Sequence, residues 1–387
     1  MQNRVHRLML KPLALLVAMA AVPAAGQEKP FYELRRHESV YVGPGREVPE
    51  PAGVDEVRIG YFGPDDPDHA EVDLWRGATL AVEEANAEGG YRGKPFRLVV
   101  AWADDPWKAG AGNLARMVYD EHIWAVVGGI DGSTTHLAEQ VVFKARLTLM
   151  SPVAADKSVN LANVPWMFSL LPGDHIIAPA LVEELHRRIG SSRFVVLSAD
   201  DHDANLFAKE LNKQYAQRQI GPRFEIHFLR GAADTTEAVR RTLAAEAAAA
   251  VVVADARDSA AVVQRLREAG FAGTIFGGPA MGRSAFADAA GDAAHGVVFP
   301  RVWEESESGR TFAARFQTRF GHAPDYAAAH SYDATRMLIA AIREAGLNRA
   351  RIRDAVRSLS PWSGATGAIV WDPLGSNRRA VRMSEKQ

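Results

Sequence analysis

The alternation of short apolar runs with helical segments is the feature that most constrains how this chain folds. Residues 57–62 (VRIGYF) predict a strand, residues 73–90 predict a helix that ends at paired glycines, and residues 96–102 (FRLVVAW) predict a second strand. The same order of elements continues almost to the end of the chain. Strands that alternate with helices predict βαβ units, and therefore doubly wound parallel sheets with helices on both faces.

The remaining apolar runs are short and almost continuously apolar, which is typical of strands buried on both faces. They span residues 124–127, 147–150, 194–197, 224–228, 250–253 and 274–276. The helices expected between and after them span residues 109–120, 134–146, 176–189, 204–219, 235–247, 259–269, 310–320, 326–345 and 349–358. The sequence therefore predicts an α/β protein whose sheets are covered by helices.

The first 26 residues predict a secretory signal peptide. Arg4, Arg7 and Lys11 precede an apolar run from Leu13 to Val22, and small residues follow it at 23–26. The run is shorter than the roughly 20 apolar residues that span a bilayer, and its flanks are those of a cleaved signal. An uncleaved membrane anchor is the alternative. No cysteine follows the run, so a lipid-anchored form is not expected, and the mature chain is expected to be soluble in the periplasm without membrane insertion.

Charge and cysteine content exclude several kinds of protein. Removing the signal leaves 42 basic and 47 acidic residues, a net charge of −5, which argues against nucleic acid or an anionic membrane as a partner. The chain has no cysteine, so disulfides, zinc–thiolate sites and thiol catalysis are ruled out. Residues 27–54 form a proline-bearing, polar extension with three aromatic side chains in its sequence. It is expected either to pack along one lobe or to act as a loose tether.

The segments that directly follow the predicted strands are the places to look for a ligand, because open α/β sheets bind ligands beyond the carboxyl ends of their strands. The sharpest of them is residues 128–135 (GGIDGSTT). Its glycines allow close approach of backbone to ligand, and Ser133 and Thr134 stand where a helix begins and free N–H groups favour a carboxylate. Ser133 could instead be a plain helix N-cap. The loop lacks the lysine of a phosphate-binding P-loop.

A series of segments, in order, resembles a known family. They are VRIGYFGP, RGATLAVEEANAEGGYRGKPFRLV, ADDPWKAGAGNLARMV, VVGGIDGSTTHLAEQV, LTLMSPVAADKSV, SYDATRMLIAAI and GAIVWDPLGS. The chain is thereby similar to the type I periplasmic solute-binding proteins of the branched-chain amino acid (Leu/Ile/Val) ABC transporter class, over residues 55–384. The resemblance implies two doubly wound Rossmann-like lobes joined by a three-crossover hinge. Lobe 1 would comprise residues 55–173 and 301–375, and lobe 2 residues 174–300 and 376–387.

The resemblance also implies a function. A monomeric protein would hold a small solute between its lobes, close around it and dock on an ABC permease in the inner membrane. In this family, hydroxyls and backbone amides after the third and fourth strands hold the carboxylate of an amino acid. Those positions are occupied here by Gly132, Ser133, Thr134, Val153, Ala154 and Ala155.

Other positions depart from the family pattern. Residues 277–282, which include Met281, lack the acid that usually holds the ammonium group of the ligand. The usual flanking aromatics are replaced near His69, Asp203 and Asp255. With Asp131 and Arg257, these side chains predict a polar, acidic cleft that suits a cationic or amide-bearing solute such as a polyamine, a urea or a basic amino acid. Alternatively, some of these acids cap helices or face solvent.

Other functions fit the sequence less well. His69, His136, His202 and Ser133 could be arranged as a catalytic triad, but the chain has neither a GxSxG nor an HExxH motif, so no enzyme and no cofactor are expected. Residues 65–69 (DDPDH) could ligate a cation, yet a solvated turn is favoured and no metal site is predicted. A ligand-sensing module of the same fold, which signals to a receptor instead of a permease, is the alternative function.

Overall fold

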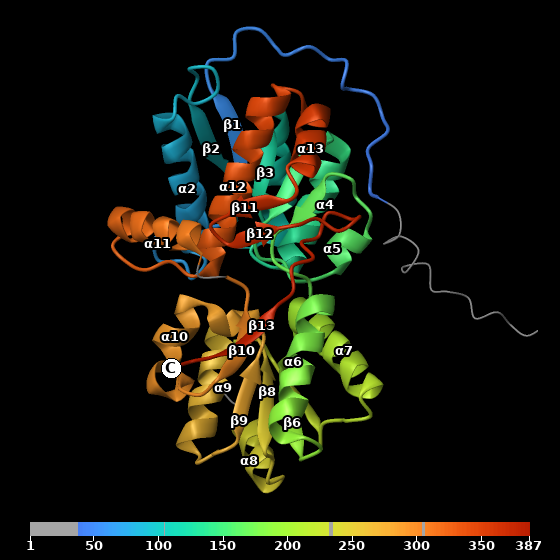
Figure 1. Ribbon diagram of the computed structural model, residues 1–387, viewed down its shortest axis with the longest axis vertical. Helices are drawn as coiled ribbons and strands as arrows, with labels where there is room; N and C mark the ends of the chain where they lie inside the picture. The colour runs from blue at the N-terminus through green and yellow to red at the C-terminus, as the bar shows by residue number, and fades with distance from the viewer. Residues whose placement is uncertain (1–37, 104, 232–234, 304–305) are drawn as a thin grey trace, which may run out of the picture.

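The computed structural model describes residues 38–103, 105–231, 235–303 and 306–387. These residues form two α/β lobes that follow one another along the long axis of the molecule (Figure 1). The predicted signal peptide lies outside the described residues. Within them, no helix is both long and apolar enough to cross a membrane.

Lobe 1 is built on a five-stranded parallel sheet with the order β2-β1-β3-β4-β5. Its strands are β1 (Val57–Phe62), β2 (Phe96–Val100), β3 (Ala125–Gly128), β4 (Thr148–Ser151) and β5 (Met167–Ser169). The helices of this lobe are α2 (Val72–Ala87), α3 (Ala111–Tyr119), α4 (Gly132–Ala145), α5 (Ser158–Leu161), α11 (Glu307–Phe320), α12 (Tyr326–Ala345) and α13 (Arg349–Ser358). Every residue of β3 and β4 is buried, as their apolar sequences predict.

Lobe 2 is built on a six-stranded sheet with the order β13-β10-β9-β8-β6-β7, in which only the edge strand β13 is antiparallel. Its strands are β6 (Phe194–Ala199), β7 (Glu225–Phe228), β8 (Ala249–Val253), β9 (Thr274–Gly277), β10 (Val298–Arg301) and β13 (Arg382–Glu385). Its helices are α6 (Asp174–Ile189), α7 (His202–Gln217), α8 (Thr236–Ala244), α9 (Ala256–Glu268) and α10 (Ser284–Ala290), with the short 3₁₀ turns η2 (Pro279–Gly282) and η3 (Gly291–Ala294).

The described chain passes between the lobes three times: from β5 to α6, from β10 to α11, and from β12 (Gly367–Ile369) to β13. β12 forms a small antiparallel hairpin with β11 (Trp362–Gly364). The predicted fold class, two doubly wound Rossmann-like lobes with a three-crossover hinge, is confirmed. The residue limits of the lobes stay a prediction. β5, β10, β11 and β12 were not predicted from their own residues, since three or four residues carry too little periodicity.

Residues 38–54 pack along lobe 1, so this part of the extension follows the first of the two expectations (Figure 1). The backbone N–H of Ser39 donates to the carbonyl of Pro373 at 2.8 Å, and the ring of Tyr41 lies 4.5 Å from that of Trp166. Farther along, Arg46 forms an ion pair with Asp354 on α13 at 2.6 Å. Contacts of three kinds therefore hold the segment on the lobe.

Candidate ligand site between the lobes

A cavity of about 550 Å³ lies between the lobes, at the carboxyl ends of strands from both sheets. Lobe 1 contributes the segments after β1, β3 and β4, and lobe 2 contributes those after β6, β7, β8 and β9. This is the edge at which open α/β sheets bind ligands, because the loops there converge while the sheets supply rigid support. Its volume falls in the range of small-molecule sites, roughly 300–1,000 Å³.

Seven of the residues predicted to contact a ligand line this cavity. They are His69, Asp131, Gly132, Val153, Ala155, Asp203 and Asp255. Two more, Ser133 and Thr134, line a second cavity of about 480 Å³ that shares several residues with the first. The structure therefore brings together side chains that are far apart in the sequence, from both lobes.

Two predicted contacts do not reach either cavity. Ala154 is 2% exposed and Met281 is fully buried. The 3₁₀ turn η2 folds Met281 back beneath the end of β9, where its sulfur packs closely against Gly277. Met281 is therefore a core residue of lobe 2, and the neighbouring Ala280 lines the cavity in its place.

The hydroxyls of the 128–135 loop serve the protein itself. Asp131 is the N-cap of α4, and its carboxylate accepts from the backbone N–H of Thr134 at 2.7 Å and from the Thr134 hydroxyl at 2.6 Å. The hydroxyl of Ser133 accepts from the indole N–H of Trp107 at 3.1 Å. The cap at this helix is thus Asp131 rather than Ser133, which corrects the N-cap alternative for Ser133.

The first backbone N–H of α4, that of Gly132, forms a hydrogen bond with a carboxylate from the other lobe. The N–H of Gly132 donates to both carboxylate oxygens of Asp203 on α7, at 3.0 and 3.1 Å. Burial, and next the charge of Asp131, raise the pKa of Asp203 to about 7. A side chain of lobe 2 therefore occupies the amide that, by resemblance, would receive the carboxylate of a ligand.

Acidic side chains outnumber basic ones around the cavity. The lining acids are Asp66, Asp68, Glu71, Asp131, Asp156, Asp174, Asp201, Asp203 and Asp255. Arg230, Arg257 and Arg283 also line it, but Arg230 already lies 3.2 Å from Asp255. Burial, followed by the charge of Asp203, raises the pKa of Asp174 well above its usual range. The crowding of carboxylates makes the cavity favourable to a positive charge.

Arg283 is held in place from the side of lobe 1. Its guanidinium contacts Asp325, the N-cap of α12, at 2.7 Å and Glu71 at 2.6 Å. Burial alone would lower the pKa of Arg283, but the two carboxylates raise it well above its usual value. Arg283 is therefore a fixed wall of the cavity, already paired by this protein's own acids.

The aromatic lining comes from residues that sequence reasoning did not identify. Phe207 and Tyr326 line the cavity, and both are more than nine-tenths buried. Phe207 lies one helical turn after Asp203 on α7, so the spacing of these two residues could have indicated it. Tyr326 comes from the distant start of α12, and no local signal points to it.

Three side chains beside the cavity form the group best placed to hold a metal ion. Within the described residues, only His136, Asp156 and His202 bring three ligand atoms of His, Asp or Glu within 4.8 Å of one another. Burial by itself would lower the pKa of His136, yet hydrogen bonds with Asp156 and Glu139 raise it to about 9. Burial likewise opposes ionisation of Asp156, but its hydrogen bonds hold its pKa below the usual value.

The other candidate clusters do not assemble. In the 65–69 turn, the carboxylate of Asp66 accepts from the backbone N–H of Asp68 at 3.0 Å, and Nδ1 of His69 accepts from the N–H of Glu71 at 3.0 Å. These are local turn contacts, as the solvated-turn interpretation predicts. The triad arrangement also fails in the described part of the chain, because Ser133 is bonded to Trp107 while both His136 and His202 face Asp156.

Two hinged α/β lobes around a polar cavity define a class of small-molecule binding protein. Comparison with known proteins agrees: a family model described as periplasmic binding protein matches residues 56–384. The chain belongs to the periplasmic binding protein family. This confirms the predicted resemblance, together with the prediction of a binding protein rather than an enzyme. It also agrees with a periplasmic location, while the signal peptide stays a prediction.

Individual relatives are distant in sequence. An amino acid binding protein of Pseudomonas aeruginosa strain PAO1 is 23% identical over 330 residues, which cover 83% of this chain and 87% of that protein. LivJ of Streptococcus pneumoniae, solved in complex with isoleucine, has a TM-score of 0.80 at 22% identity, over 86% of this chain and 96% of that one. A solute-binding protein of R. palustris in complex with benzoate has a TM-score of 0.76 at 13% identity, over 86% and 93%.

Proposed function

We propose that this chain is the periplasmic substrate-binding component of an ABC-type transporter. It captures a small polar solute in the cavity between its lobes, closes around it at the hinge and delivers it to a membrane permease. Support comes from the three chain passages between the lobes and from lining residues that both lobes contribute. A cavity divided between two hinged bodies couples binding to closure, since the ligand contacts both walls only in the closed form.

The solute, we propose further, presents a positive charge or an amide to the cleft. The observation that carries this is the bond from the N–H of Gly132 to Asp203. With that amide taken by an internal carboxylate, an amino acid would have to displace Asp203 before its own carboxylate could bind there. A cation meets the opposite situation, because it supplies positive charge to a wall where carboxylates crowd together.

The relatives show that this fold does not dictate the ligand. One structural neighbour holds isoleucine and another holds benzoate, although both share the overall architecture. Specificity must therefore come from the side chains of the cleft. Here Phe207 and Tyr326 supply an apolar wall for the carbon skeleton of a solute, while the acids supply the charged contacts.

The experiment is a thermal-shift screen of the purified protein against amino acids, amides, ureas, polyamines and small aromatic acids. A ligand at 100 times its dissociation constant stabilises the native state by about 2.7 kcal/mol, which raises the melting temperature measurably. We expect the largest shifts from cations or amides. A shift confined to leucine, isoleucine and valine would contradict the proposed ligand class, and a flat screen would contradict solute capture itself.

Matched variants then locate the site. Asp255→Asn keeps an N-cap for α9 while removing a charge from the cavity, so it should weaken binding of a cation at least tenfold. Asp292→Asn removes an exposed acid that lies outside the cavity and should leave binding unchanged. Uptake of the solute by cells lacking the protein tests the transport role, and normal uptake there would favour the sensing alternative.

A further inference from the structure

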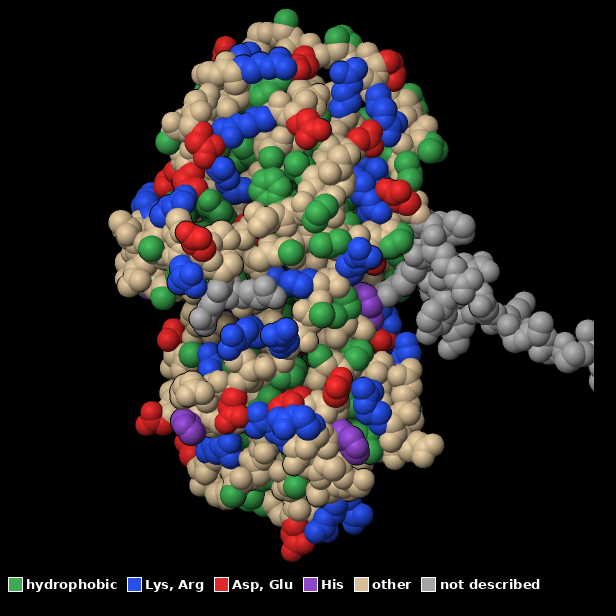
Figure 2. All heavy atoms as spheres, in the orientation of Figure 1, with side chains coloured by type: hydrophobic (Ala, Val, Ile, Leu, Met, Phe, Trp, Pro, Cys, Tyr) green, Lys and Arg blue, Asp and Glu red, His purple; other side chains and the backbone are tan. Residues whose placement is uncertain are grey.

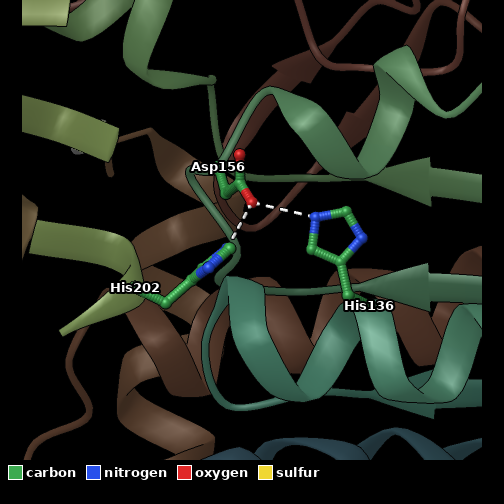
Figure 3. Close-up of side chains that lie close together, drawn as sticks. All are labelled: His136, Asp156 and His202. Carbon is green, nitrogen blue, oxygen red and sulfur yellow. Dashed lines mark hydrogen bonds and ion pairs between the residues drawn. The ribbon is translucent and has the colours of Figure 1, made fainter. Parts of the chain in front are cut away.

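The group beside the cavity draws one ligand atom from each of three elements and joins the two lobes. His136 projects from α4 and Asp156 lies in the loop after β4, both in lobe 1, whereas His202 is the first residue of α7 in lobe 2. Figure 3 shows the two imidazole rings approaching the carboxylate of Asp156 from different sides. The three side chains thus face a common point across the junction.

The distances suit a tetrahedral metal site. Nε2 of His136 and Nε2 of His202 each lie 3.0 Å from the same oxygen, Oδ2 of Asp156 (Figure 3). Ligand atoms around a tetrahedral zinc ion, with bonds of roughly 2.0–2.2 Å, lie about 3.3 Å apart. The third pair of ligand atoms, the two imidazole nitrogens, lies within 4.8 Å, so all three side chains could reach one ion.

Three polar atoms crowd the oxygen at the centre of the group. Besides the two imidazoles, the hydroxyl of Ser158 lies 2.7 Å from Oδ2 of Asp156 and 2.8 Å from Nε2 of His136. A carboxylate oxygen has two lone-pair positions, yet three polar groups converge on this one. A cation resolves this crowding, because it accepts lone pairs from the nitrogens and the oxygen together.

A carboxylate stands behind one of the imidazoles. Oε2 of Glu139 lies 3.1 Å from Nδ1 of His136, and the Glu139 side chain is only 5% exposed. Metal-binding histidines almost always donate their other N–H to such a group, which fixes the tautomer and directs the free nitrogen toward the metal. Here that arrangement directs Nε2 of His136 toward Asp156 and His202.

We propose that His136, Asp156 and His202 bind a divalent transition-metal ion, with Zn²⁺ as the preferred one, and that the bound ion ties the two lobes together. Two imidazoles and one carboxylate favour Zn²⁺ over Ca²⁺ or Mg²⁺, which take mainly oxygen ligands. The metal site adjoins the proposed solute contacts, since His202 directly precedes Asp203 and Asp156 borders the cavity, but it uses neither Asp203 nor Asp255 as a ligand. Because its ligands come from both lobes, the ion binds the closed arrangement best and favours closure in return.

The test is calorimetric titration of ZnCl₂ into the purified, EDTA-treated protein. We expect one ion per chain with a dissociation constant of micromolar or lower, and a rise in melting temperature on binding. His202→Gln should weaken binding at least tenfold, and because the side chain of His202 is 43% exposed, the variant should fold normally. His186→Gln, which changes an exposed histidine of α6, is the matched control and should bind Zn²⁺ as the original chain does.

A second variant separates a metal site from a cluster that is only hydrogen-bonded. His202→Cys removes the imidazole but supplies a thiolate, a preferred zinc ligand, in a chain that has no other cysteine. Zinc affinity should return to within tenfold of the original value. The proposal is overturned if Zn²⁺ does not bind, if His202→Gln binds it as tightly as the original chain, or if His202→Cys binds it no better than His202→Gln.

Discussion

Two of the polar junctions that connect the lobes beside the cavity are built from different chemistry. The arginine junction consists of Arg283 from lobe 2 with Glu71 and Asp325 from lobe 1, and the histidine junction consists of His202 from lobe 2 with His136 and Asp156 from lobe 1. The side chains of Arg283 and Asp325 are 7% and 5% exposed, whereas that of His202 is 43% exposed.

The difference separates a fixed contact from an adjustable one. A guanidinium keeps its charge at any physiological pH and binds no metal, so the arginine junction holds the same form under all conditions in which the protein works. Imidazoles can lose protons and ligate metals. The molecule thus has one interlobe contact that sets geometry and another whose strength can vary with its surroundings.

The largest expected effect comes from breaking the arginine junction. Arg283→Met keeps a long side chain but leaves Asp325 buried without its cation, so we expect a loss of about 3–5 kcal/mol in the free energy of unfolding. Urea denaturation measures this loss. Arg240→Met, which breaks an exposed ion pair with Glu237 on α8, is the control and should leave the free energy of unfolding almost unchanged. Equal losses in the two variants would remove the distinction between a buried junction and a surface pair.

A buried histidine outside both junctions also makes the stability of the protein sensitive to acid. His330 is fully buried in α12, and burial lowers its pKa to about 3. Its usual pKa is near 6.5, so unfolding takes up a proton between pH 6.5 and 3, and stability falls as the pH drops through that window. Between pH 7 and pH 5, the original chain should therefore lose about 2 kcal/mol more than His330→Leu.

Urea denaturation of both chains at the two pH values tests this. The comparison also removes the opposing contribution of Asp333, whose pKa burial raises to about 6 and which both chains share. His186→Leu, at an exposed histidine, should behave as the original chain does. If His330→Leu loses as much stability as the original chain, the acid-sensitive group lies elsewhere.

In the absence of metal, the histidine junction should contribute less to stability than the arginine junction does. Because His202 is partly exposed, His202→Gln should lower the free energy of unfolding of EDTA-treated protein by only about 0.5–1.5 kcal/mol. Thermal or urea unfolding beside Arg283→Met gives the comparison directly. A loss as large as that of Arg283→Met would show that the two junctions are equally structural.

The smallest expected effect comes from a substitution at Ser133, which lines the second cavity. Ser133→Ala removes the acceptor for the indole N–H of Trp107, whose side chain is largely exposed, so water can replace the lost bond. We expect a change of about 0.5 kcal/mol or less in unfolding free energy. Tryptophan fluorescence should report the altered surroundings of Trp107. A loss above 1.5 kcal/mol would mean that this loop, rather than either junction, limits stability.

The fold could be predicted well because its signals are local. The run at residues 57–62 coincides with β1, and the helix predicted at residues 326–345 coincides with α12. The helix predicted at 109–120 differs at its start, where a π-helical turn, Pro106–Gly110, precedes α3. The third and fourth strand ends also placed Asp131 and Val153 at the cavity, since parallel strands present their carboxyl ends at one edge.

The candidate site was predictable only in part because it depends on contacts between lobes. Asp203 was predicted as a ligand contact, but no sequence pattern shows that it bonds to Gly132 from the opposite wall. The sequence presents His136 and His202 only as candidate catalytic groups, and no pattern points to Asp156. These three residues meet only when α4, the loop after β4 and α7 are placed in space. Met281 does not reach the cavity as predicted, because the 3₁₀ turn η2 directs its side chain into the core of lobe 2.

The extension and the last strand have a practical consequence for following the molecule in solution. Val42 lies in the extension held on lobe 1 and is 91% exposed, whereas Gln387 is an exposed residue just after β13 in lobe 2. Because the chain contains no cysteine, thiols introduced at these two positions would be the only ones that a maleimide dye could label. A donor and an acceptor fluorophore there would report the separation of the lobes by energy transfer, with no label in the cavity. The doubly labelled protein would therefore act as a fluorescent sensor of ligand binding.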